Sequence, residues 1–260
     1  MPKLIYKLPN LLIILLCIAM INVLAHVTPS IVKALFFIHP TEETVKIAQS
    51  LFALLGATIG MFIGFLLNQA QSNFQAASAL VASEASQINN LDRLLLRFGD
   101  AYSLEIRAKL KLYIESIIQN EWPELRLEQG SQQTHLLWRT ISQMLFKLEP
   151  VTPKQIAIYS DILDVAENVS ESREIRIDRS TQKLPAIFWI SILFIFIAIS
   201  SITSLVMPGN ELNFAITVFP IIYGSMLGLL IIFDQPFKGS TSVKSTALKK
   251  VFASIETRTE

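Results

Sequence analysis

The amino-acid sequence predicts an all-α integral membrane protein with four transmembrane helices, two at each end of the chain, and a polar helical domain between the two pairs. Composition is the first observation behind this prediction. Hydrophobic residues make up 52% of the 260 residues and charged residues only 17%, whereas soluble domains average about 25% charged residues. The second observation is that the charges are unevenly placed. Residues 47–83 contain no Lys, Arg, Asp or Glu, and residues 184–237 contain only Glu211 and Asp234.

Four apolar segments are long enough to cross the hydrocarbon of a bilayer, which takes about 20 residues of helix. They are residues 8–27, 45–67, 184–207 and 212–233. The first segment follows two lysines and resembles a signal peptide in that respect. Its apolar run is long for a signal peptide, however, and the A-x-A cleavage pattern is missing, so we expect a retained anchor.

The positions of lysine and arginine predict which side of the membrane each loop occupies, because cytoplasmic flanks retain these residues. The N-terminal tail contains two lysines and the C-terminal tail contains four lysines and an arginine, whereas the loop at residues 208–211 contains neither. We therefore expect a multi-pass protein of the inner (plasma) membrane with both termini in the cytoplasm. The predicted divisions are two transmembrane helices in residues 1–69, a cytoplasmic helical domain in 70–183, two transmembrane helices in 184–237 and a cytoplasmic tail in 238–260.

Apolar and small residues recur at helical spacing through the polar middle of the chain. Over residues 74–97 this pattern continues directly from the second span, which predicts one long helix. Further helices are expected over residues 103–121, 132–148 and 153–179, with breaks at Gly99-Asp100 and Gly130-Ser131 and an N-cap at Thr152. No internal repeat and no strand pattern interrupts this helical region.

No enzyme signature, cofactor motif or metal-ligand spacing is present, so the sequence predicts neither catalysis nor a bound metal. The one cysteine, Cys17, lies in an apolar run, and the three histidines are scattered. A formal net charge of +1 also gives no sign of the basic stripe typical of nucleic-acid binding. These observations leave membrane transport or scaffolding as the functional classes to weigh.

One run of charges in the middle segment has the spacing of a helix face. Glu167, Glu171 and Glu174 recur at helical spacing, and Arg173 and Arg176 interleave with them. We interpret this run as a solvated face with salt bridges rather than a site.

The second span carries the most informative pattern of the sequence. Gly56, Gly60 and Gly64 lie four residues apart and form one stripe of the helix, along which another backbone can approach closely. The partner of this stripe is left open, since it can be a helix of the same chain or the same helix of another copy.

A different face of the same span is formed by Leu54, Thr58, Met61 and Phe65. If copies surround an axis, this face lines an apolar and uncharged pore, and such pores gate by constriction and dewetting. Asn68 and Gln69 follow at the cytoplasmic end, where they would form the pore mouth.

The end of the fourth span and the start of the third carry two interfacial residues. Asp234 closes the fourth helix, and we expect its carboxylate to accept backbone N–H groups in the turn before Pro236. Trp189, near the inner end of the third span, is expected to anchor that helix at the interface.

Several short motifs together resemble the bestrophin-like membrane family. They are Gly64-Phe65-Leu66-Leu67, Asn73-Phe74-Gln75-Ala76-Ala77, Ser83-Glu84-Ala85, Leu184-Pro185 with Trp189, and the ending Asp234, Pro236, Phe237, Gly239 of the fourth span. Their order and spacing fit over nearly the whole chain.

This resemblance implies a homo-oligomeric, pentameric ion channel with four spans per subunit, in which the second span lines a hydrophobic neck. Phe65 would then take the place of one neck phenylalanine, with Met61 one turn above it. The chain departs from animal bestrophins after Pro236-Phe237, because no acidic residue follows until Glu256. A calcium clasp of their kind is therefore not expected.

Two functional hypotheses follow. The first is a homo-oligomeric ion channel in a lipid bilayer, which binds inorganic ions and no nucleic acid. The alternative is a non-conducting membrane scaffold or sensor, favoured by the size of the middle segment, whose cytoplasmic helices bind a partner. An uncharged pore face gives no preference between anions and cations.

Overall fold

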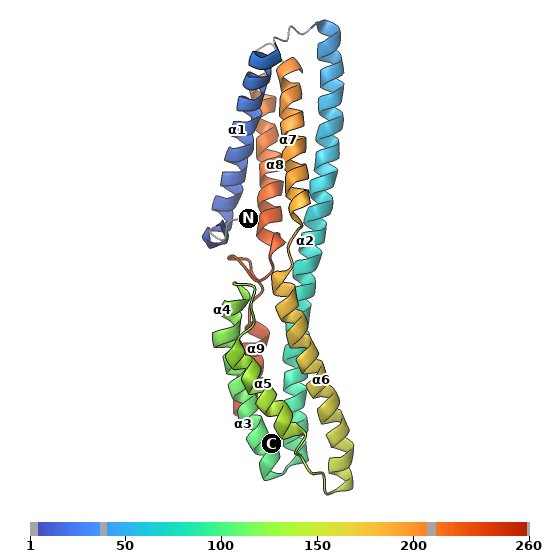
Figure 1. The fold of residues 1–260 in the computed structure, drawn as a ribbon, viewed down its shortest axis with the longest axis vertical. Helices are drawn as coiled ribbons and strands as arrows, with labels where there is room; N and C mark the ends of the chain where they lie inside the picture. The colour runs from blue at the N-terminus through green and yellow to red at the C-terminus, as the bar shows by residue number, and fades with distance from the viewer. Residues whose placement is uncertain (1–4, 37–40, 207–211, 259–260) are drawn as a thin grey trace. The chain divides into compact units, whose positions relative to one another are not determined.

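The computed structural model describes residues 5–36, 41–206 and 212–258, with side chains left out at 36 and 204–217. These residues form helices joined by short loops, with no strand among them (Figure 1). The chain divides into two compact units. The apolar unit comprises Met1–Asn73, Lys183–Gln235 and Gly239–Thr241; the polar unit comprises Phe74–Gln182, Pro236–Lys238 and Ser242–Glu260. The predicted all-α membrane fold class is confirmed.

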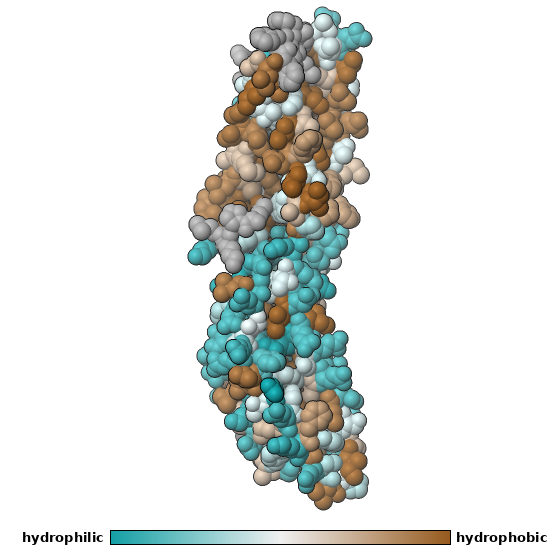
Figure 2. Space-filling view, viewed as in Figure 1, coloured by the Kyte–Doolittle hydropathy of each residue, from teal (hydrophilic) through white to brown (hydrophobic). Residues whose placement is uncertain are grey.

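The apolar unit contains the short η1 (Ile5–Lys7), α1 (Asn10–Phe36), α7 (Ala186–Val206), α8 (Leu212–Asp234) and the first half of α2 (Glu42–Phe98). Three described stretches are long and apolar enough to cross a membrane; they lie in Asn10–Leu35, Glu42–Phe98 and Pro153–Thr203. A shorter apolar stretch, Val218–Asp234, lies in α8. Figure 2 shows that the visible side chains of this unit are mostly hydrophobic and those of the polar unit mostly hydrophilic. That contrast is typical of a chain whose two units occupy lipid and water.

Helices α1 and α8 of the apolar unit approach each other closely. A Cβ atom added to Gly224 would lie 2.6 Å from Ile18 Cα, and one added to Gly228 would lie 2.8 Å from Ile14 Cα. Two glycines four residues apart thus let the two backbones meet. This pair was not predicted, although its four-residue spacing is the same as that of the glycines in the second span.

The polar unit contains the second half of α2, then α3 (Ala101–Ser116), η2 (Ile117–Glu121), α4 (Trp122–Leu125), α5 (Gln132–Leu145), α6 (Pro153–Thr181) and α9 (Thr246–Thr257). The predicted continuity of the second span into this unit is confirmed, because α2 is one helix of 57 residues. Its end at Phe98 is set by Gly99, whose φ of +79° suits glycine.

Local capping explains where the next helices begin. Asp100 accepts a hydrogen bond from the Ser103 amide at 2.6 Å, which caps α3. Thr152 and Gln155 form a reciprocal capping box at the start of α6, which satisfies two otherwise unpaired amides. The predicted breaks at Gly99-Asp100 and Gly130-Ser131 and the N-cap at Thr152 are confirmed.

The predicted helix over residues 103–121 is not a regular α-helix to its end. Ile117–Glu121 is π-helical, and the Trp122 amide donates to the Ile117 carbonyl. Pro123 has no N–H and cannot continue the α-helical ladder, which fits a wider turn just before it. The π turn places Glu121 inside the unit, where its side chain is fully buried.

Residues 238–260, which were expected to form a cytoplasmic tail, contain the helix α9. Leu248 and Ile255 of α9 are buried in the core of the polar unit. Beyond it, Arg258 donates to Asp92 at 2.6 Å and to Asn89 at 2.9 Å. Leu248, Val251, Phe252 and Ile255 recur at the i, i+3, i+4, i+7 spacing of an amphipathic helix, so the sequence carried a signal for α9 that was overlooked.

Candidate functional site

The apolar part of α2 has two faces that differ in burial. Ile59, Ile63 and Leu66 are buried against other helices of the apolar unit. The predicted pore-lining residues lie on the opposite side and are exposed; they are Leu54, Thr58, Met61 and Phe65. Met61 is 78% and Phe65 65% exposed, so one chain leaves this face uncovered.

The glycine stripe of α2 lies partly against α8 of the same chain. The Tyr223 hydroxyl donates to the Gly56 carbonyl at 2.7 Å, and a Cβ atom added to Gly60 would lie 3.6 Å from that hydroxyl oxygen. Nothing lies within 4 Å of the corresponding position at Gly64. Of the two partners left open by the sequence, Gly56 and Gly60 thus have one within the chain.

The exposed face of α2 differs in composition from the exposed faces of its neighbours. On α1 and α7 the exposed positions are mainly large and apolar, among them Leu11, Leu15, Val23, Ile187, Ile190, Leu193 and Phe194. On α2 the exposed positions also include small and polar side chains, among them Ala53, Ala57, Thr58, Asn68 and Gln69. Gln69 donates to Asn73 at 3.1 Å along this face. Small side chains allow membrane helices to pack closely, and amide side chains are costly in hydrocarbon, so both suit a protein interface or a water-filled path.

Asp234 accepts a backbone hydrogen bond, but from a different segment than the sequence analysis expected. Its Oδ1 atom accepts from the Leu184 amide at 2.7 Å, at the entry of α7, and not from the turn before Pro236. The donor lies 50 residues away in the sequence, so no local sequence pattern could have predicted it. Trp189 is half-buried and packs against the core of the apolar unit.

The rest of the Asp-x-Pro-Phe-x-Gly motif forms a tight loop. The Pro236 carbonyl accepts from the Val243 amide at 2.8 Å. Phe237 is buried in the polar unit, with its ring edge-on to Trp122 at 5.9 Å between centroids. Gly239 has φ of +81°, a conformation that side chains with a Cβ atom disfavour.

The Gly239→Ala variant is expected to lose about 1 kcal/mol of stability, because alanine is strained at this φ. The added Cβ atom itself would fit, since its nearest neighbours, two atoms of Tyr6, would lie 3.9 Å away. Thermal unfolding of the purified protein measures the loss. Gly64→Ala is the matched control, since Gly64 is helical and has no neighbour within 4 Å. Equal melting temperatures for Gly239→Ala and Gly64→Ala would contradict the argument.

The family model that describes the bestrophin-like domain matches residues 18–248. The chain belongs to the bestrophin-like family. No protein with curated annotation matches it.

Solved structures have the same fold. A bacterial bestrophin homologue from Klebsiella pneumoniae matches with a TM-score of 0.68 at 15% identity, covering 94% of this chain and 96% of that chain. A point variant of that homologue matches with a TM-score of 0.68 at 14% identity, covering 94% of this chain and 99% of that chain. The crystal structure of a point variant of a membrane protein matches with a TM-score of 0.69 at 14% identity, covering 94% of this chain and 99% of that chain. At these identities the likeness extends to the fold alone.

In this bestrophin-like chain, the interpretation of Arg173 and Arg176 as part of a solvated face is wrong. Both arginines are buried. Arg176 donates to Glu84 at 2.7 Å and to Glu121 at 2.7 Å, and Arg173 also binds Glu121. Their positions continue the buried apolar stripe formed by Ile162, Ala166 and Val169. That continuation was the signal in the sequence that could have placed them inside.

The buried arginine stays charged because its partners outweigh its desolvation. Burial by itself lowers the pKa of Arg176, but the carboxylates of Glu84 and Glu121 raise it overall. Burial, followed by the charge of Glu84, raises the pKa of Tyr113 well above its usual value. Within the described residues no group of three or more His, Cys, Asp or Glu has the arrangement of a metal site. The contacts of Arg173 and Arg176 with Glu84 and Glu121 form an ion-pair network that joins α2, η2 and α6.

Proposed function

We propose that this chain is the subunit of a homo-oligomeric ion channel, pentameric as in bestrophins, whose pore is lined by α2. The observation that carries the proposal is the exposed face of α2. It is free of charged residues from position 47 to 83, and it mixes small and amide side chains with Met61 and Phe65. A face of this kind is unsuited to lipid, and copies arranged around an axis would cover it.

Within this arrangement Met61 and Phe65 form the neck. Both side chains are large and apolar, they lie four residues apart, and both are mostly exposed in one chain. A ring of such side chains narrows a pore and removes water from it without any charge, so it controls conduction by dewetting. Asn68 and Gln69, one turn further along, supply the polar mouth on the cytoplasmic side. The multi-pass orientation in the inner membrane, with both termini cytoplasmic, belongs to the same proposal.

The experiment is single-channel recording of the purified protein in planar bilayers. The wild-type protein is expected to conduct, and Phe65→Ala and Met61→Ala are each expected to raise the conductance or the open probability because they widen the neck. Phe194→Ala is the matched control: Phe194 is 73% exposed on α7 and Phe65 is 65% exposed on α2. Phe194→Ala should leave the currents unchanged.

Bilayers that stay silent over a wide range of voltage, pH and salt, with an intact oligomer, would contradict the channel proposal. They would favour the alternative of a scaffold or sensor. Equal effects of Phe65→Ala and Phe194→Ala would contradict the assignment of the pore to α2 while leaving conduction in place.

A further inference from the structure

The outward face of α6 is acidic along most of its length. Six carboxylates at helical spacing are exposed, namely Asp161, Asp164, Glu167, Glu171, Glu174 and Asp178. The two arginines that interleave with them in the sequence point inward to Glu84 and Glu121. Within the described part of the chain, none of the six carboxylates forms an ion pair. The fold thus separates charges that the sequence places side by side, and among the described residues it leaves these six carboxylates without a cationic partner, although Gln182 donates to Asp178.

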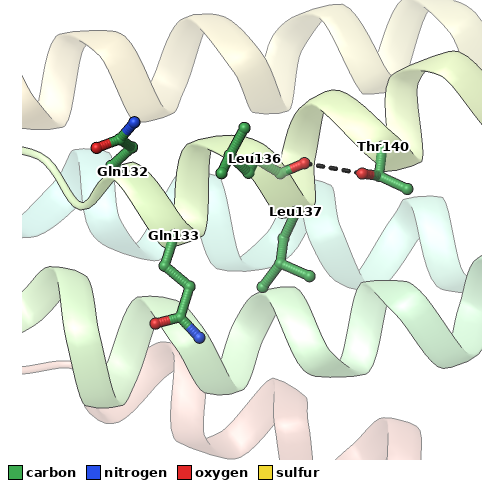
Figure 3. Close-up of a pocket in the computed structure, with 5 residues that line it drawn as sticks. All are labelled: Gln132, Gln133, Leu136, Leu137 and Thr140. Carbon is green, nitrogen blue, oxygen red and sulfur yellow. Dashed lines mark hydrogen bonds between the residues drawn. The ribbon is translucent and has the colours of Figure 1, made fainter.

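Another helix of the polar unit exposes basic and apolar side chains. Arg139 and Lys147 are exposed on and just beyond α5, and within the described residues neither forms an ion pair. Leu136 is 51% exposed on the same helix. Figure 3 shows the open hollow that Gln132, Gln133, Leu136, Leu137 and Thr140 line on this surface. We call this surface the α5 face. We call the surface formed by the six carboxylates of α6 the α6 face.

We propose that the α6 face of one copy binds the α5 face of a neighbouring copy. This inference rests on the proposed homo-oligomer and names the surfaces through which its polar units meet. A ring closes only through a heterologous interface, in which two different faces of the subunit come together. The α6 and α5 faces lie on different helices and carry opposite charge. Contact between two α6 faces would instead bring six carboxylates from each copy together, which repulsion opposes.

Charge complementarity favours this contact, because neither the carboxylates of the α6 face nor the cations of the α5 face form ion pairs within the described part of one chain. Exposed single charges are common, but six carboxylates on one helix face repel one another unless a basic surface lies near them. The neighbour's Arg139 and Lys147 supply that charge. Leu136 and the open hollow of the α5 face also provide apolar surface. Ile175 on α6 of the neighbouring copy is 37% exposed and can pack there.

Cysteine cross-linking in the full-length protein tests the contact. Cys17 is the only cysteine, so Cys17→Ser gives a background without thiols. In this background, Glu171→Cys with Arg139→Cys is expected to yield a ladder of covalent oligomers when oxidised or treated with a short bifunctional maleimide. Glu171→Cys with Lys250→Cys is the control, because Lys250 is exposed on a different helix, α9. Absence of a ladder, or cross-links within single chains only, would overturn the proposal.

Charge reversal separates a specific contact from a chance collision. Glu171→Arg with Glu174→Arg should reduce cross-linking between Asp164→Cys and Arg139→Cys by about tenfold. Adding Lys147→Glu should restore part of it, because opposite charges again face each other. An unchanged yield would overturn the proposal.

The outcome of the cross-linking experiment can be distinguished from the outcome of the conduction experiment. A ladder with silent bilayers supports the interface and contradicts conduction, whereas currents without a ladder support conduction and overturn the interface.

Discussion

The Arg176→Met variant is expected to destabilise the polar unit by about 3–5 kcal/mol, the usual cost of removing one partner from a buried ion pair. Arg176 and Glu84 are both fully buried, and their closest atoms lie 2.7 Å apart. Arg176 also lies over Trp122, with its guanidinium carbon 5.5 Å from the ring centroid. Methionine retains most of the volume but leaves Glu84 buried with no cation, so the loss is electrostatic and not a matter of packing.

Thermal unfolding followed by tryptophan fluorescence measures this loss, since Trp122 and Trp138 belong to the polar unit. Arg179→Met is the matched control, because Arg179 lies one turn further on α6 and is only half-buried. The double variant Glu84→Gln with Arg176→Met should recover part of the stability, because it removes the unpaired charge. If Arg176→Met and Arg179→Met melted at the same temperature, the network would have no structural importance.

The Gly224→Ala variant is expected to disrupt the packing of α1 on α8. Its new Cβ atom would lie 2.6 Å from Ile18 Cα and 2.8 Å from Ile18 N, and neither backbone atom can rotate away. One helix must therefore move, at a cost of about 1–3 kcal/mol. The gain in helix propensity from glycine to alanine, about 1 kcal/mol, offsets only part of this cost.

Cys17 reports this change directly, because it is the only cysteine, it precedes Ile18 and it is buried in the apolar unit. The rate at which a maleimide labels Cys17 in detergent should rise in Gly224→Ala. The same measurement on Gly64→Ala should match the wild type, because nothing lies within 4 Å of that position. Labelling that is equally slow in both variants would show that α1 and α8 tolerate an added methyl group.

The glycine pairs show how far sequence patterns reach. A four-residue spacing identifies a helix face on which backbones can approach, and it does so equally for α2 and α8. It does not say which pair is in tight contact. In the structure Gly224 and Gly228 meet backbone atoms of α1, whereas Gly56 and Gly60 face a tyrosine side chain. That difference depends on how two helices, far apart in the sequence, are placed.

Asp234 illustrates the same limit. Its position at the end of an apolar helix correctly predicted a carboxylate that accepts a backbone N–H group. The donor, Leu184, was not predictable, because local turn chemistry names only neighbours in the sequence.

The sequence by itself determined the all-α membrane class, the continuous second helix, the breaks at glycine and the N-cap at Thr152. Each of these depends on local causes: the length of an apolar run, the missing Cβ of glycine, or a side chain that reaches its own backbone. Only the tertiary structure decided which charged side chains of α6 are buried and which are exposed. Helical spacing continued a buried apolar stripe through Arg173 and Arg176, but only the carboxylates of Glu84 and Glu121 make two buried arginines stable there. A buried charge is stable only beside a partner, and that partner lies on another helix.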